Sequence, residues 1–103
     1  MSWWSPKHAL RSFIFTDGQI EAVSRDGDAL VVSFRDYGAA LVRLRFSGVT
    51  EHWVSEDACH YETMSARFER SGGLWTALLR DDDEEPLLRV TYVDATHSFI
   101  EQG

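Results

Sequence analysis

Two segments near the middle of the chain place apolar side chains with a period of two residues. In residues 29–35 apolar side chains occupy every second position, and in residues 40–46 they alternate with Arg43 and Arg45. A period of two residues is that of a β-strand with one buried face. Both segments are therefore predicted as strands whose arginines point outward.

Shorter apolar runs bounded by turn residues predict further strands. Asp-Gly at positions 17–18 and 26–27 is a strong hairpin signal, and Gly72-Gly73 marks another turn. Residues 55–70 fit either a helix or a strand; we favour a strand over 61–70, with any helix confined to 55–60. Residues 49–54 continue the strand of residues 40–46 beyond a kink or bulge at Ser47-Gly48. The remaining strands are predicted at residues 8–15, 19–25, 74–80 and 87–93, with residues 94–100 as an optional last short strand.

This pattern predicts an all-β fold, a single antiparallel β-sandwich or partly open barrel of seven to eight short strands.

Part of the sequence also recurs in similar form. The run LRFSGV (44–49) returns as LRVTYV (88–93), and Gly27 returns as Gly72. We therefore consider two related halves, residues 19–54 and 62–100, although chance similarity between amphipathic strands competes with this interpretation.

Length and charge narrow the possible partners. The 103 residues suit one domain, residues 1–103, and the formal net charge is −7. An acidic surface repels phosphate groups, so nucleic acid and anionic membranes are not expected as partners. A basic protein partner, or a second copy of the chain as a homodimer, fits better.

A single cysteine, Cys59, rules out an internal disulfide and favours a reducing compartment. The first residues lack the sustained apolar run of a secretory signal, and no run approaches the roughly 20 apolar residues of a membrane helix. We therefore expect a cytoplasmic protein.

The most conspicuous charged feature is an acidic run on the loop between two predicted strands. It docks a basic partner surface in one interpretation and is a solvated hairpin tip in the other, while its spacing matches no EF-hand loop. The run consists of Asp81, Asp82, Asp83, Glu84 and Glu85.

Large aromatic residues are the second candidate for partner contacts, because interfaces are enriched in aromatic anchors within a charged rim. The alternative is that they fill the core of a small domain. The candidates are Trp3, Trp4, Tyr37, Trp53 and Trp75.

Outward-facing arginines are a weaker candidate, for anion binding. Arg43, Arg45 and Arg89, with Arg35 and Arg67, fall on the polar faces of their strands. If these strands adjoin, the guanidinium groups form a stripe; otherwise they pair with glutamates on neighbouring strands.

The sequence offers little to support catalysis. Cys59 and His60 are adjacent and cannot act together as nucleophile and base, and no zinc-binding spacing occurs. His52 and His97, 45 positions apart, suit equivalent positions in the two halves. No catalytic or nucleotide-binding motif appears, so we predict no cofactor, no metal and no enzymatic activity.

Residues 7–10 (KHAL), the Asp-Gly hairpins, residues 44–49 and the closing LRVTYVDA (88–95) resemble small bacterial all-β domains of unknown function. Some similar domains occur among immunity proteins that neutralise partner toxins. The resemblance covers residues 7–96 and departs at Ala9, where many such chains have aspartate after the histidine. It carries over no functional residue, but it implies a binding role. The alternative is a small-ligand or anion-binding domain, or an enzyme using the Arg and His face.

Overall fold

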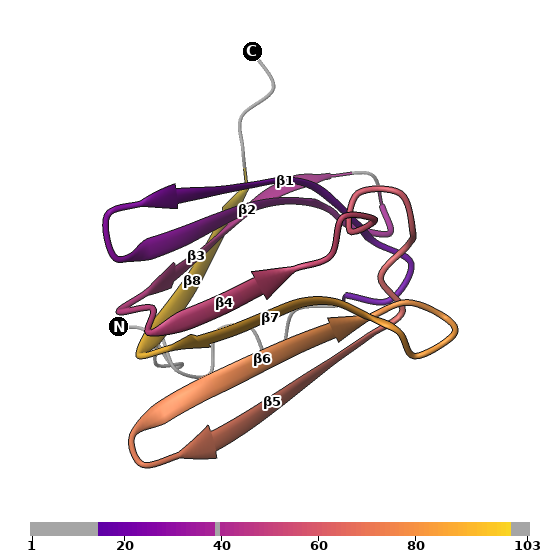
Figure 1. Cartoon of the computed structure of the whole chain (residues 1–103). Helices are drawn as coiled ribbons and strands as arrows, with labels where there is room; N and C mark the ends of the chain where they lie inside the picture. Colours follow the sequence, from indigo (N-terminus) through magenta and orange to yellow (C-terminus); the bar gives the residue numbers. More distant parts are fainter. Residues whose placement is uncertain (1–14, 39, 100–103) are drawn as a thin grey trace.

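Eight strands make up the regular structure of the chain (Figure 1). The computed structural model describes residues 15–38 and 40–99, and no helix occurs among them. No helical segment long and apolar enough to cross a membrane is found in that part of the chain. The strands are β1 (Gln19–Asp26), β2 (Ala29–Arg35), β3 (Leu41–Ser47), β4 (Glu51–Val54), β5 (Ser65–Ser71), β6 (Leu74–Arg80), β7 (Pro86–Tyr92) and β8 (Asp94–Phe99).

The strands form two four-stranded antiparallel sheets that are not closed into a barrel, and this confirms the all-β prediction in its sandwich form. One sheet has the order β1-β2-β3-β8 and the other the order β4-β7-β6-β5. In each sheet three strands consecutive in sequence pair with one another. The fourth strand comes from the other half of the chain: β8 pairs with β3, and β4 pairs with β7.

The two chain segments that change sheets meet each other. Gly48, between β3 and β4, has a φ of 65°, and a Cβ there would lie 2.8 Å from Cγ2 of Val93, which stands between β7 and β8. The Val93 amide donates to the Ser47 carbonyl at 2.9 Å. Only glycine allows both this backbone conformation and this close approach. The predicted kink at Ser47-Gly48 is therefore the point where the chain leaves the first sheet.

The two halves share one strand order, with the fourth strand of each exchanged. Leu30 pairs with Phe46, and Trp75, 45 positions after Leu30, pairs with Tyr92. Tyr92 lies 46 positions after Phe46, one more than the 45 positions between Leu30 and Trp75. The register shift between Leu79 and Arg80 accounts for this extra position. The duplication itself stays a prediction, and the pairing does not align the two LR motifs.

The core lies between the facing surfaces of the sheets. The aromatic rings of Phe46 and Tyr92, one from each sheet, pack edge to face with 4.9 Å between their centroids. Each fully buried aliphatic or aromatic side chain contributes roughly 1.5–3 kcal/mol. The inward residues of the central strands include Val32, Phe34, Val42, Leu44, Ala77, Leu79, Leu88 and Val90.

Residues 55–64 differ from the prediction. Residues 55–60 form successive turns with i to i+3 hydrogen bonds, from the Ala58 amide to Ser55 and from the His60 amide to Asp57, rather than a helix. The strand expected over 61–70 begins only at Ser65. Before it, Thr63 is fully buried and its amide donates to the Gly18 carbonyl at 2.7 Å, so this residue pairs with a segment distant in sequence rather than with β6. The strand predicted at residues 8–15 lies outside the described residues except for Phe15, which is not in a strand.

Three connections gather at one end of the sandwich: residues 36–40 after β2, residues 55–64 after β4 and residues 81–85 after β6 (Figure 1). The β1–β2 and β5–β6 hairpins lie at the opposite end. The acidic run therefore shares its end of the molecule with the long β4–β5 connection.

Candidate functional site

The acidic loop, residues 81–85, is a turn held by hydrogen bonds to its first residue. One oxygen of Asp81 accepts hydrogen bonds from the amides of Asp83 and Glu85, both at 2.9 Å. The Asp81 amide in turn donates to the Glu85 carbonyl at 3.0 Å. Asp81 is only 7% exposed, so this carboxylate is part of the loop's framework rather than a group that meets a partner.

The other acidic side chains of the loop are exposed. Glu84 has a φ of 62° and reaches back to Arg80, with 3.7 Å between oxygen and nitrogen. Asp82, Asp83 and Glu85 are likewise open to solvent. The structure thus divides the predicted acidic run into one anchoring residue and four that carry negative charge at the surface.

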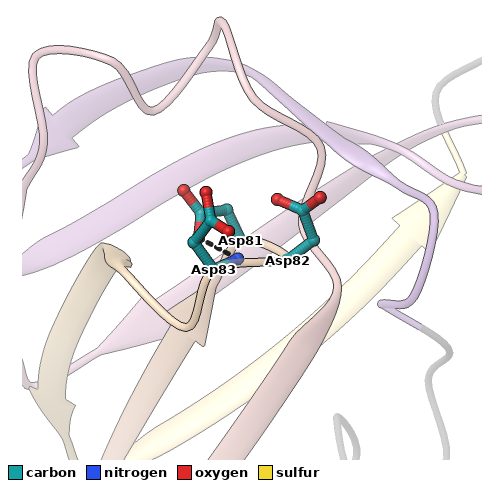
Figure 2. Close-up of side chains that lie close together, drawn as sticks. All are labelled: Asp81, Asp82 and Asp83. Atoms are coloured by element: carbon teal, nitrogen blue, oxygen red, sulfur yellow. Dashed lines mark hydrogen bonds between the residues drawn. The ribbon is translucent and has the colours of Figure 1, made fainter.

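The first three carboxylates of the loop lie close together (Figure 2). Asp81, Asp82 and Asp83 each place one oxygen within 4.8 Å of the others. Because Asp81 already accepts two amide hydrogen bonds, the turn itself accounts for this spacing. The cluster alone therefore does not identify a metal site.

A hollow of 530 Å³ opens between the acidic loop and the β4–β5 connection. We call it the acidic hollow. Two exposed aromatic residues, Trp53 on β4 and Tyr61 in the connection, line it with exposed fractions of 45% and 52%. Its other lining residues are Ser55, Asp57, Asp81, Asp83, Glu85, Pro86 and Leu87. Aromatic faces thus stand beside several carboxylates in one concave site.

A second hollow of 530 Å³ lies on the other side of Trp53 and Pro86, which line both. We call it the arginine hollow, because Arg80 and Arg89 line it together with Leu78 and Glu84. Its position follows from the strand register: Trp53 pairs with Arg89, and Arg89 pairs with Leu78, in one row across the outer face of the sheet. Charges of opposite sign therefore flank a single tryptophan.

The predicted aromatic contacts do not form one cluster. Trp53 lies beside the acidic loop, whereas Tyr37, 65% exposed, belongs to the β2–β3 loop of the other sheet. Trp3 and Trp4 lie outside the described residues. The expectation that Trp75 is an exposed contact residue is wrong: it is 4% exposed on the inner face of β6, with the Arg70 guanidinium 5.8 Å from its ring centroid.

The arginine stripe does not form. Arg43 and Arg45 project from β3 in one sheet and Arg89 from β7 in the other, each between buried neighbours, so they lie on the two opposite outer faces of the sandwich. Arg35 pairs with Glu21 across β1 and β2 at 3.4 Å, and Arg45 with Asp26 at 3.1 Å. Two of the five predicted arginines, Arg35 and Arg45, therefore pair with acidic residues on β1.

The histidines occupy equivalent strands but separate sheets. His52 on β4 lies in register with Val90 and His97 on β8 with Leu44. The exposed His52 ring nitrogen Nδ1 lies 3.0 Å from Arg25. Partial burial lowers the pKa of His97 below its ordinary value by desolvating the charged form. Neither histidine lines either hollow.

Sequence reasoning missed Tyr61, Asp57 and Arg80 as site residues. The sequence places Tyr61 in the strand predicted over 61–70 and Asp57 in the possible short helix over 55–60. Both instead line the acidic hollow because the β4–β5 connection folds over the end of the sheet. The usable signal was an aromatic residue within a polar, turn-rich stretch, since exposed aromatics often mark interaction sites.

Comparison of the chain with protein-family models, curated proteins and solved structures finds no match in any of the three. The two hollows on either side of Trp53 are therefore the basis for a functional proposal. They combine concave shape, exposed aromatic surface and separated charge.

Proposed function

We propose that this protein is a non-enzymatic binding module that holds a basic protein partner in the acidic hollow. The observation that carries the proposal is the placement of Trp53 and Tyr61 in one 530 Å³ hollow with the carboxylates of Asp57, Asp83 and Glu85. The side-chain hydrogen bonds of the turn come from Asp81, so the turn does not need the carboxylates of Asp82, Asp83 and Glu85.

The chemistry of the acidic hollow suits an arginine side chain. A guanidinium stacks on aromatic faces and forms paired hydrogen bonds with carboxylates, whereas an ammonium group does neither as well. Cation–π contacts contribute about 0.5–2 kcal/mol, depending on how far they are shielded from water. The net charge of −7 adds long-range attraction that speeds encounter with a basic surface.

The resemblance to small bacterial domains, some of them immunity proteins, supports a binding role of the same kind. Such a protein acts by occupying a partner, and an acidic aromatic surface is suited to a basic toxin. We place this activity in the cytoplasm, consistent with the lone Cys59.

Two other functions have specific support. Arg80 and Arg89 line a hollow in which an anion fits, which supports the alternative of a ligand-binding domain. Arg43 and Arg45, which were predicted for the same role, do not line this hollow. Self-association as a homodimer would cover exposed aromatic surface such as Trp53 and Tyr61. Light scattering at low and moderate salt separates the homodimer from a monomer that keeps this surface for another protein.

The direct test reverses charge on the acidic loop. Its probe is a short dansyl-labelled arginine-rich peptide, whose association is followed by stopped-flow fluorescence at low salt. Asp82→Lys with Asp83→Lys should slow association about tenfold, because electrostatic steering is lost. The free energy of unfolding should change by no more than about 0.5 kcal/mol, since neither side chain supports the turn.

The matched control is Asp28→Lys with Glu69→Lys, which changes net charge equally. Asp28 lies in the β1–β2 hairpin and Glu69 on β5, and both are exposed and outside either hollow. The control should slow association far less. If both double variants slow association equally, the effect depends only on net charge and not on the position of the loop. Unaltered association in the loop variant would refute the proposal.

A further inference from the structure

The two hollows beside Trp53 carry opposite charge and are therefore suited to a ligand with two charges. They share Trp53 and Pro86 as lining residues. The acidic hollow offers carboxylates, and the arginine hollow offers two guanidinium groups. Occupation of the acidic hollow alone by an arginine would leave Arg80 and Arg89 without a role in binding.

Arg89 has the capacity to take an anionic group. Its side chain is exposed on β7, and no acidic group within the described residues forms an ion pair with it. Arg80 is more enclosed, with 27% of its side chain exposed, and its pair with Glu84 is long at 3.7 Å. Glu84 is 81% exposed, so little free energy holds this pair together.

We infer that the partner segment carries an arginine and a carboxylate side chain next to each other on one face, with the arginine in the acidic hollow and the carboxylate on Arg89 and Arg80. This inference rests on the proposed function. It deepens that function by specifying the second residue that the site recognises.

An extended segment provides this arrangement. Residues i and i+2 of an extended chain project to the same side, roughly 7 Å apart. The side chain between them points away from the surface, which leaves the backbone lying over Trp53. A bidentate contact between a guanidinium and a carboxylate adds orientation as well as affinity. The order of the two charges along the groove then fixes the direction of the bound segment.

The test uses three acetylated and amidated peptides that differ only in charge. The first, Gly-Ser-Arg-Ser-Glu-Ser-Gly, has both charges; the second replaces its glutamate with glutamine; the third replaces its arginine with glutamine. Dissociation constants are measured at low salt from the NMR shift of the Trp53 indole N–H, assigned with a Trp53→Phe variant. The first peptide should bind about three- to fivefold more tightly than the second.

Two arginine variants locate the effect. Arg89→Gln should remove the advantage of the first peptide over the second, while both still bind. Arg43→Gln is the matched control: Arg43 is exposed on β3 in the other sheet and likewise forms no ion pair among the described residues. It should leave the advantage unchanged.

The outcomes separate the two proposals. Equal binding of the first and second peptides overturns the inference and leaves the proposed function standing. An advantage that survives Arg89→Gln also overturns it, because the carboxylate then binds elsewhere. If neither arginine-bearing peptide shifts Trp53 up to millimolar concentration, both proposals fail. Preference for the third peptide would instead favour an anion-binding site.

Discussion

The β2–β3 loop and the β6–β7 loop share one set of hydrogen bonds around an aspartate, which we call the frame, but they expose different side chains. In the first, one oxygen of Asp36 accepts from the amides of Gly38 and Ala40, both at 2.9 Å. In the second, Asp81 makes the same two contacts five residues before β7 begins. The amide of each aspartate also donates to the carbonyl of the residue four positions on, at 2.9 and 3.0 Å.

The exposed side chains of the two loops differ completely. The first exposes Tyr37 and no acidic residue after Asp36, whereas the second exposes four consecutive acidic side chains. A single aspartate thus suffices to shape the turn, and the other positions are free to serve binding. This difference is the main reason for assigning function to residues 82–85 rather than to the turn itself.

The largest effect is expected from removing the two framework aspartates. Asp81→Ala should lower the free energy of unfolding by about 2 kcal/mol, because two amides lose their acceptor in a buried setting. Asp36→Ala should cost only about 1 kcal/mol, since Asp36 is less buried and water replaces the acceptor more easily. Urea unfolding measures both values.

Asp82→Ala is the control for this comparison, and its effect should stay within about 0.5 kcal/mol. Asp81→Asn should retain much of the stability, because an amide oxygen still accepts both hydrogen bonds. An Asp82 variant as unstable as the Asp81 variant would show that the frame is not confined to the first residue.

These loops also show how far sequence reasoning reaches. The bounds of β2 and β6 match the prediction, because alternation and turn residues are local signals. In β6 the face of Trp75, Ala77 and Leu79 is wholly apolar, whereas the other face mixes leucine with Thr76 and Arg80. The alternation therefore favours burial of Trp75. Listing this residue as a contact candidate because it is aromatic did not take that local signal into account.

The acidic loop was also located correctly, but not the hollow beside it. That hollow depends on residues 55–64, whose path is fixed by the bridge between Thr63 and Gly18. A contact between residues 45 positions apart leaves no periodic signal. For the same reason the sequence did not show that Arg89 and Arg43 project from different sheets.

A smaller difference between the halves concerns their equivalent histidines. Burial lowers the pKa of His97 in the folded state relative to about 6.5 in the unfolded chain. The unfolded state then binds more protons, so this contribution to stability is present above pH 6.5 and is lost as the pH falls toward the folded-state pKa. Solvent screening keeps the effect small, because His97 is only partly buried.

His97→Gln should therefore make stability less sensitive to acid. Denaturant unfolding of the wild type and the variant at pH 7.5 and about pH 5.5 measures this difference. The wild type should lose more stability than the variant over this interval. Equal losses would show that His97 does not contribute to the acid response.

The most direct test of the central claim places the side chains of the β2–β3 loop on the β6–β7 loop, whose hydrogen bonds to Asp81 are kept. The variant D82Y/D83G/E84A/E85A gives the β6–β7 loop the residues of positions 37–40 and keeps Asp81. We expect it to fold, with stability within about 1 kcal/mol of the wild type, because the frame is retained. Its affinity for the arginine-rich peptide, followed at the Trp53 indole, should fall at least about tenfold. Unchanged affinity in this folded variant would contradict the account, because the exposed carboxylates would then have no part in binding.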